Sequence, residues 1–420
     1  MKRILNSLIF VLLVMVAGAQ NYHVMEQLKA DPRRAYGNDY PYNHETRSLT
    51  KAPRGYKPFY ISHYGRHGSR YYWNDRLYKD LDTLLTTAHE RHQLTPEGEA
   101  FHDRFMAVKS ELMAGWSELT QLGWEQHQTI ARDMYSHFQD VFRHGGKVMA
   151  ISSLVGRCVI SMSAFCQELV QCNPKIEIRE QSSRMTLHGV APDNLQNPLR
   201  REFPKCTPRY EQRKDEIPQD TIFTQTLLSR VFTSTDGLPG NHKKIRSLLT
   251  NLYTSLPSIA HEGMMGNILS DEELASQWES DNLGGYSWMF STRYKAIPIL
   301  EDIIRKADDI LEGRSNRLAD LRFGHDTYIG PLTVLLGING ADSDPEDPAK
   351  VKYCYQNWET CMASNIQLIF YRSKKSADEI LIKCLLNGEE ATLPVPTTQA
   401  PYYRWSDFKD YYQTQMMRVQ

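Results

Sequence analysis

The chain has 420 residues, of which 41% are hydrophobic and 24% are charged, a composition typical of a globular protein with one large or two medium domains. Its 49 Lys and Arg residues almost balance its 50 Asp and Glu residues, which leaves a formal net charge of −1. That balance excludes a broadly basic nucleic-acid-binding protein. Any site for an anion must therefore be a local cluster of cationic side chains.

The N-terminus has the pattern of a secretory signal peptide. Lys2 and Arg3 precede an apolar run over residues 8–16, and Ala17-Gly18-Ala19 has the small residues of a cleavage site. The apolar run is too short to span a bilayer comfortably, which argues against a membrane anchor. We predict a signal peptide over residues 1–19 and an exported protein, periplasmic or secreted, that has no membrane attachment after cleavage.

Cysteine and histidine spacings give no metal signature. The seven cysteines are an odd number, so at least one is free or pairs between molecules, and the sequence leaves their connectivity open. The chain has no C-x-x-C, and His89-Glu90-Arg91-His92 is one residue shorter than H-E-x-x-H. We therefore predict neither a metal site nor a cofactor.

Three predicted strands are each followed by charged or imidazole side chains. The strands cover residues 59–61, residues 148–151 and a stretch from residue 318 onward. Ligands of open α/β sheets bind just beyond the carboxyl ends of strands, so we expect the side chains that follow to meet at one sheet edge. These side chains are Arg66, His67, Arg70, Arg157, His325 and Asp326.

Apolar residues at helical spacing predict helices between these strands. They occur through residues 75–140, where Thr120 is a predicted helix cap, from Ser161 to about residue 170, and over residues 298–311. Further helices are predicted from Thr327 onward and in the tail from Tyr402.

Other segments predict the rest of the sheet and its surroundings. Residues 175–180 alternate as a strand, and residues 362–371 and 380–386 form two more, the last followed by an Asn387-Gly388 hairpin turn. Residues 20–56 are polar and turn-rich, and we expect them to form a lead that packs loosely on the core.

The six side chains suit phosphoryl transfer. Arg66 and Arg70 present planar guanidinium groups that match phosphate oxygens. Nearby arginines disfavour protonated His67, which can therefore act as a nucleophile below neutral pH. Asp326 lies where a general acid would protonate a leaving alkoxide and then activate water. Because arginines can stabilise the charge on the phosphoryl oxygens, this chemistry requires no metal ion.

Arg66-His67-Gly68-Ser69-Arg70 resembles the R-H-G-x-R signature of the histidine acid phosphatases, which include the phytases. A second R-H-G at residues 143–145 lacks the following arginine and precedes a strand, so we interpret it as a loop. The segment from Ser152 to Phe165 is similar to one in multiple inositol polyphosphate phosphatases. Gly324-His325-Asp326-Thr327 resembles the H-D signature of phytases, whereas inositol polyphosphate phosphatases often have H-A-E there.

This resemblance implies a fold, a division of the chain and residue roles. The fold is a doubly wound α/β sheet of mixed or parallel strands with flanking helices and a smaller α-helical cap, similar to phosphoglycerate mutase. Residues 20–190 and 300–420 would form the α/β domain, and residues 191–299 the cap. His67 would form a phosphohistidine, and Arg157 and His325 would be further phosphate ligands.

The implied activity is metal-independent hydrolysis of phosphomonoesters, with phytate or lower inositol phosphates as preferred substrates. Arg184 and His188 follow a predicted strand and are candidates for contacts with distal phosphates. The alternatives are a broad-specificity or sugar-phosphate phosphatase and an exported phosphate-binding module without turnover. A nucleotide enzyme is disfavoured because the chain has no G-x-G-x-x-G and no P-loop. We expect a monomer that binds a small phosphorylated molecule and no nucleic acid.

Overall fold

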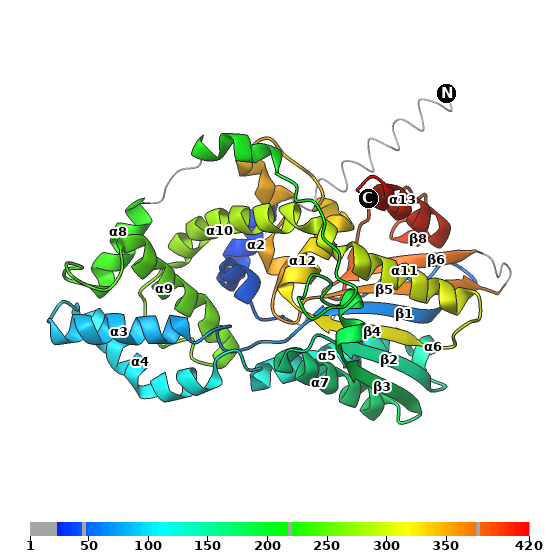
Figure 1. The fold of residues 1–420 in the computed structure, drawn as a ribbon, viewed down its shortest axis with the longest axis horizontal. Coiled ribbons are helices and arrows are strands. Elements are labelled where there is room, and N and C mark those ends of the chain that lie inside the picture. Colours follow the sequence, from blue (N-terminus) through cyan, green and yellow to red (C-terminus); the bar gives the residue numbers. More distant parts are fainter. Residues whose placement is uncertain (1–22, 44–47, 217–220, 375–378, 420) are drawn as a thin grey trace.

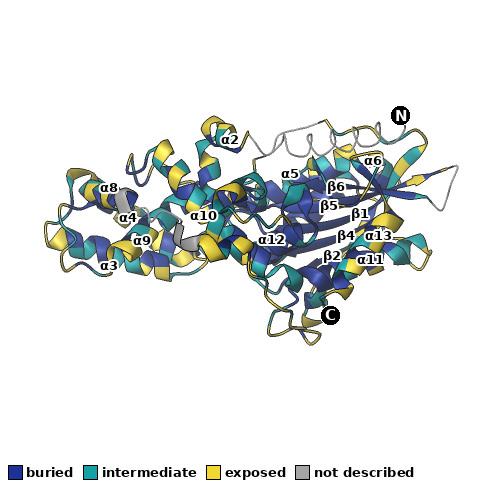
Figure 2. Ribbon diagram, turned by 90° about the horizontal axis from the view of Figure 1, so that it is seen from above, coloured by how far each residue is buried: buried dark blue, intermediate teal, exposed yellow. Residues whose placement is uncertain are grey.

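The structure is a computed structural model that describes residues 23–43, 48–216, 221–374 and 379–419. The predicted signal peptide lies outside these residues. Figure 1 shows a twisted sheet with helices on both faces at one end of the molecule and a body of helices at the other. In Figure 2 the central strands are almost entirely buried, whereas the helices carry exposed outer faces.

Eight strands make one sheet. They are β1 (Tyr56–Arg66), β2 (Gly146–Ser152), β3 (Ile176–Ser182), β4 (Ala319–Gly324), β5 (Asn365–Ser373), β6 (Ile380–Leu386), β7 (Glu389–Ala391) and β8 (Tyr402–Arg404). Their order is β3-β2-β4-β1-β5-β6-β7, and β8 pairs with β6. The first four strands in this order are parallel, and β5 to β8 pair antiparallel. The predicted mixed α/β sheet is therefore confirmed.

Helices cover both faces of this sheet and form the separate helical body. The α-helices are α2 (Val24–Ala30), α3 (Arg76–Glu90), α4 (Pro96–Gly115), α5 (Gln121–His137), α6 (Gln139–Phe142), α7 (Gly156–Cys172), α8 (Thr221–Val231), α9 (His242–Ser255), α10 (Asp271–Ser291), α11 (Ile297–Leu311), α12 (Asp326–Leu335) and α13 (Trp405–Met417). Among the described residues, no helix combines the length and apolar character that a membrane crossing requires.

The sheet has a separate apolar core on each face. Phe165 of α7 and Ile130 of α5 are buried against the β1 and β4 side chains Ile61 and Leu321. On the opposite face, the buried side chains of α11, α12 and α13 pack against Tyr60 and other residues of β1, β5 and β6. Successive side chains of a strand point to opposite faces, so one strand contributes to both cores.

The helical body has its own core, in which α3, α4, α8, α9 and the start of α10 pack together. The helices of the predicted insert, residues 191–299, thus pack with two helices that precede it in sequence. The N-terminal segment is also part of this core, because Val24, Leu28 and Tyr40 are buried in it. The prediction of a loosely packed lead is therefore wrong. The segment has few apolar residues, but several of them are buried in the core of the helical body.

The boundaries of two predicted elements differ from those observed. The strand predicted from residue 362 begins at Asn365, and Tyr402 lies in the short strand β8 before helix α13. The predicted hairpin turn is confirmed, because Asn387 and Gly388 have φ angles of 54° and 82°, and β7 pairs back on β6. Two consecutive positive φ angles are what a two-residue hairpin loop requires.

Candidate active site

The carboxyl ends of β1, β2 and β4 lie side by side, as predicted. In the parallel register Arg66 is opposite Gly324, and Ser152 is opposite Phe323. The backbone N–H of His67 donates to the carbonyl oxygen of Gly324 at 3.0 Å. This hydrogen bond joins the ends of β1 and β4, at the residue that precedes His325.

Buried polar contacts fix the turn after β1. Gly68 N donates to Ser161 Oγ at 3.1 Å, and Ser69 N donates to Gln126 Oε1 at 2.8 Å. A Cβ atom on Gly68 would lie 2.3 Å from the carbonyl oxygen of Gly123, so no other residue fits there. Helix α5, which supplies Gln126, starts at the predicted Thr120 cap, whose hydroxyl accepts a hydrogen bond from Gly123 N.

His67 is buried and held in one tautomer. Its Nδ1 lies 2.9 Å from the carbonyl oxygen of Gly68, which can only accept a hydrogen bond, so Nδ1 carries the proton. Nε2 then keeps its lone pair. Burial lowers the pKa of His67 well below its usual value, and the charges of Arg157, Arg66 and Arg70 lower it further. The imidazole therefore stays neutral in mild acid, with the lone pair of Nε2 available.

The three arginines use only some of their donors within the protein. Arg66 Nη1 donates to the carbonyl oxygens of Asn38 (2.5 Å) and Thr360 (2.8 Å). Arg70 Nη1 donates to Tyr71 O at 3.1 Å, and Arg157 Nη1 donates to Ser117 Oγ at 2.7 Å.

Other donors of the same arginines are buried and have no hydrogen-bond partner among the described residues. They are Nε and Nη2 of Arg66, Nε of Arg70 and Nε of Arg157. An unsatisfied buried donor costs about 1–3 kcal/mol, and more for a charged group, so these donors would be stabilised by an anion.

Two helix N-termini adjoin these arginines. Arg157 is the second residue of α7, and His325 is the N-cap of α12. The sequence predicted the first of these helices to begin at Ser161, but it begins at Gly156, so Arg157 lies in its first turn. The positive end of each helix dipole favours a bound anion at this edge.

His325 contacts both strand ends around it. Arg157 Nη2 donates to His325 Nδ1 at 3.4 Å, and His325 Nε2 lies 3.0 Å from Ser153 Oγ. Burial lowers the pKa of His325 to about 4, with a further contribution from Arg157. The ring of His325 meets that of His67 edge-on, with 5.5 Å between centroids. Its role as a phosphate ligand stays a prediction.

Two carboxylates face the arginines. Asp326 Oδ2 lies 3.6 Å from Arg66 Nη2, and Thr327 N donates to its Oδ1 at 2.9 Å. Asp39 Oδ1 lies 3.8 Å from Arg70 Nη2. Burial raises the pKa of Asp326, but the charges of Arg66 and Arg70 outweigh it and the net shift is downward. For Asp39 burial prevails over the same arginines, and its pKa is raised.

Asp39 is a site residue that no pattern in the sequence indicates. It lies at the end of the 3₁₀ helix η2 (Pro32–Asp39), in the polar, turn-rich segment predicted to be a loose lead. Asn38 of the same pair accepts the hydrogen bond from Arg66. The N-terminal segment therefore completes the site from outside the sheet.

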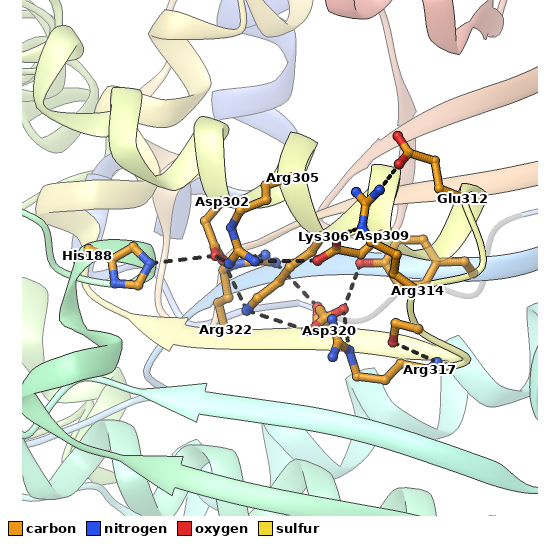
Figure 3. Close-up of polar contacts among 12 residues, drawn as sticks. His188, Asp302, Arg305, Lys306, Asp309, Glu312, Arg314, Arg317, Asp320 and Arg322 are labelled. Carbon is orange, nitrogen blue, oxygen red and sulfur yellow. Dashed lines mark hydrogen bonds and ion pairs between the residues drawn. The ribbon is translucent and has the colours of Figure 1, made fainter.

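The structure places Arg184 and His188 in the 3₁₀ helix η3 (Arg184–Gly189), which follows β3. Arg184 is exposed. His188 Nε2 lies 3.8 Å from Asp302 Oδ1, and its Nδ1 bonds to Met185 O. Figure 3 shows His188 beside a network of charged residues along α11 and β4. The structure thus pairs His188 with Asp302, and contacts of these two residues with distal phosphates stay a prediction.

The second R-H-G lies in the turn between α6 and β2, at the amino end of β2. Arg143 pairs with Asp140 at 3.1 Å and donates to His144 Nε2 at 3.1 Å, and both Arg143 and His144 are exposed. The other R-H-G lies at the carboxyl ends of the parallel strands, so the two copies are at opposite ends of these strands.

The fold is shared with solved phosphatases. The multiple inositol polyphosphate phosphatase of Bifidobacterium longum, in complex with inositol hexasulfate, matches with a TM-score of 0.69 at 18% identity, over 90% of this chain and 97% of that one. The D. castellii phytase matches with 0.65 at 15% identity, over 91% and 85%. Hafnia alvei phytase in complex with tartrate matches with 0.53 at 12% identity, over 86% and 98%. No family model and no curated protein sequence matches the chain.

Proposed function

We propose that this chain, which has the fold of inositol polyphosphate phosphatases and phytases, hydrolyses phosphate monoesters through a phosphohistidine at His67 and without a metal ion. The observation that carries the proposal is the site itself. The Nδ1–H of His67 donates to Gly68 and its Nε2 has no partner, and the guanidinium groups around it have buried donors without a partner among the described residues.

The reaction has two steps. His67 Nε2 attacks phosphorus, and the bond to the ester oxygen breaks while Asp326 gives its proton to the departing alkoxide. Water then attacks the phosphohistidine, its proton passes to the Asp326 carboxylate, and the N–P bond breaks to release phosphate. Arg66, Arg70 and Arg157 hold the phosphoryl oxygens throughout.

The protonation of Asp326 is coupled to substrate binding. In the free enzyme the arginines hold its pKa down, so the carboxylate is ionised. A bound phosphate dianion neutralises those arginines and places negative charge beside Asp326, and both effects favour its protonated form. Asp39, whose pKa is raised, is a second carboxyl that retains a proton more readily beside Arg70.

Phytate or lower inositol phosphates are the substrates that we propose. The B. longum enzyme of this fold was solved with inositol hexasulfate, and two further proteins of this fold are phytases. Three arginines against two carboxylates, one of them with a raised pKa, leave excess positive charge for an anionic substrate. A panel of phytate, sugar phosphates and p-nitrophenyl phosphate separates this proposal from a broad-specificity phosphatase.

Trapping of the intermediate tests the mechanism. EDTA-treated enzyme is mixed with labelled substrate and quenched in acid or in alkali, and the His67→Ala variant serves as control. We expect a phosphoenzyme that is stable in alkali and labile in acid, and none in the variant. An alkali-labile adduct points to a carboxylate nucleophile, an EDTA-dependent loss of turnover contradicts metal independence, and tight phosphate binding without turnover indicates a binding module.

A further inference from the structure

The junction of α3 and α4 contains a cluster of metal-ligating side chains. His89 comes from the last turn of α3, and Glu99 and His102 come from the start of α4. One potential ligand atom from each residue lies within 4.8 Å of the other two. His89 Nδ1 and Glu99 Oε2 are 2.6 Å apart. The segment His89-Glu90-Arg91-His92 contains only one member of this cluster, because Glu99 and His102 lie on the next helix.

His102 has the environment of a metal-binding histidine. Its Nδ1 lies 3.1 Å from Asp103 Oδ1, and since a carboxylate accepts, Nδ1 carries the proton and Nε2 keeps its lone pair. Metal-bound histidines almost always donate the N–H of the second ring nitrogen to a carboxylate, a backbone carbonyl or water, and Asp103 provides such an acceptor. The side chain of His102 is only 11% exposed, so its ring is fixed by packing.

We propose that His89, Glu99 and His102 form a Zn²⁺ site. Two imidazoles and one carboxylate are a ligand set that zinc uses, with water in the fourth tetrahedral position. The imidazole rings of His89 and His102 are parallel, with centroids 4.4 Å apart, whereas each ring binds a metal within its own plane. His89, whose side chain is 50% exposed, therefore turns toward the ion while buried His102 stays in place.

The ion would add a link between α3 and α4, which already pack together in the core of the helical body. This turn lies toward the end of the helical body that is distant from the sheet (Figure 1), so we assign the site a role in stability and none in turnover. The inference is independent of the proposed hydrolase activity. Zinc binding requires deprotonated ligands and therefore weakens as the solution is acidified.

The test is titration of EDTA-stripped, full-length protein with Zn²⁺ at pH 7.5, by calorimetry against a competing chelator. We expect one ion per chain, a rise of about 2–4 °C in melting temperature at saturating zinc, and loss of both at pH 5. Co²⁺ should give the visible absorption of a tetrahedral centre, and Mg²⁺ should have no effect.

Variants locate the site. His89→Ala and Glu99→Gln change partly exposed side chains and should weaken zinc binding roughly tenfold or more, and Asp103→Asn should weaken it by about tenfold through His102. His92→Asn is the matched control, because His92 is exposed, has a positive φ that asparagine tolerates and lies outside the set. Equal zinc affinity of the wild type, His89→Ala and Glu99→Gln overturns the proposal, as does a wild type that binds no zinc.

Discussion

Two groups of buried arginines in this protein differ in what their donors contact. Arg322, in the middle of β4, donates from Nε and Nη2 to Asp302 at 3.1 and 2.8 Å and from Nη1 to Ser62 Oγ at 3.0 Å. Lys306 joins Asp302 and Asp320 to the same network (Figure 3). Arg66 is equally buried, but its Nε and Nη2 have no hydrogen-bond partner in the described part of the chain.

The difference separates a structural arginine from a ligand-binding one. Around Arg322 the carboxylate of Asp302 is ionised, because burial raises its pKa but the charges of Arg322 and Lys306 hold it well below its usual value. In that network Asp302 is paired with both Arg322 and Lys306. Asp320 is paired with Lys306 and Arg317. Around Arg66 the three arginines outnumber the two carboxylates, and we propose that a bound phosphate supplies the missing partner. The two arginines lie close together, because β1 and β4 are neighbours and Arg322 is two residues before the end of β4, opposite Tyr64 of β1.

The strongest test exchanges the two kinds of arginine for alanine. Arg70→Ala should lower kcat/KM by about 10³-fold or more and change the free energy of unfolding by about 1 kcal/mol. It loses the hydrogen bond to Tyr71 and the contact with Asp39 at 3.8 Å, but it also removes a buried donor that has no partner among the described residues. Arg322→Ala should instead destabilise the fold by about 3–5 kcal/mol, because it leaves buried carboxylates without their main partner. Urea unfolding and steady-state kinetics measure the two effects.

The comparison between the arginines fails if the two variants behave alike. An Arg70→Ala variant that unfolds as readily as Arg322→Ala would mean that the active-site arginines are also structural. A fully stable Arg322→Ala variant with reduced activity would place Arg322 in the site and not in the core.

Asp326→Asn sharpens the comparison at the carboxylate beside Arg66. An inositol alkoxide needs a proton as it leaves, whereas p-nitrophenolate leaves largely without one, so phosphorylation by phytate should fall about 10²–10⁴-fold more than phosphorylation by p-nitrophenyl phosphate. Slow hydrolysis of the phosphoenzyme should then give a burst of nitrophenol. Rapid-quench single-turnover rates with both substrates measure the difference.

Equal losses for the two substrates would mean that Asp326 is not the proton donor. Its role would then be structural, through the hydrogen bond that it accepts from Thr327 N. Asp39→Asn, beside Arg70, is the matched variant. It should keep the ratio of the two rates close to that of the wild type, because it removes a carboxyl from the site without removing the proposed donor.

The sequence predicted the site residues that follow the strands, but it did not predict Asp39 or the cluster of His89, Glu99 and His102. Arg66, His67 and Arg70 are adjacent in sequence, and parallel pairing of predicted strands suffices to bring His325 to them. Asp39 comes from a segment with no regular pattern, and only tertiary packing places it beside Arg70. The His89, Glu99 and His102 cluster likewise depends on how two helices meet, which no spacing within one helix reveals.

Two buried histidines beneath the site, His63 and His127, are further polar groups with few or no hydrogen-bond partners. Neither ring nitrogen of His63 has a hydrogen-bond partner in the described residues, the ring of His127 has only the backbone of Arg66 as a partner there, and burial lowers both pKa values to about 3. The unfolded chain binds protons at these residues below pH 6.5, whereas the folded chain does not. The free energy of unfolding should therefore fall by about 2 kcal/mol per histidine between pH 7.5 and pH 5.

Urea unfolding of His127→Leu at the two pH values tests this expectation. The variant should show a smaller loss of stability on acidification than the wild type, while His92→Asn, which changes an exposed histidine, should show the same loss as the wild type. An unchanged pH dependence in His127→Leu would mean that His127 is protonated, and therefore hydrated, in the folded protein.

The smallest expected effect concerns the second R-H-G. Arg143 and His144 are exposed at the amino end of β2 and already contact Asp140 and each other, so they have neither the burial nor the unpartnered donors of the first copy. His144→Ala should keep kcat/KM near the wild-type value, measured beside His67→Ala with the same substrate. A loss of more than about tenfold, which is about 1.4 kcal/mol of transition-state stabilisation, would show that a histidine outside the arginine cluster takes part in the reaction. In that case the buried arginine donors without partners, which occur only around the first copy, would not explain which copy is active.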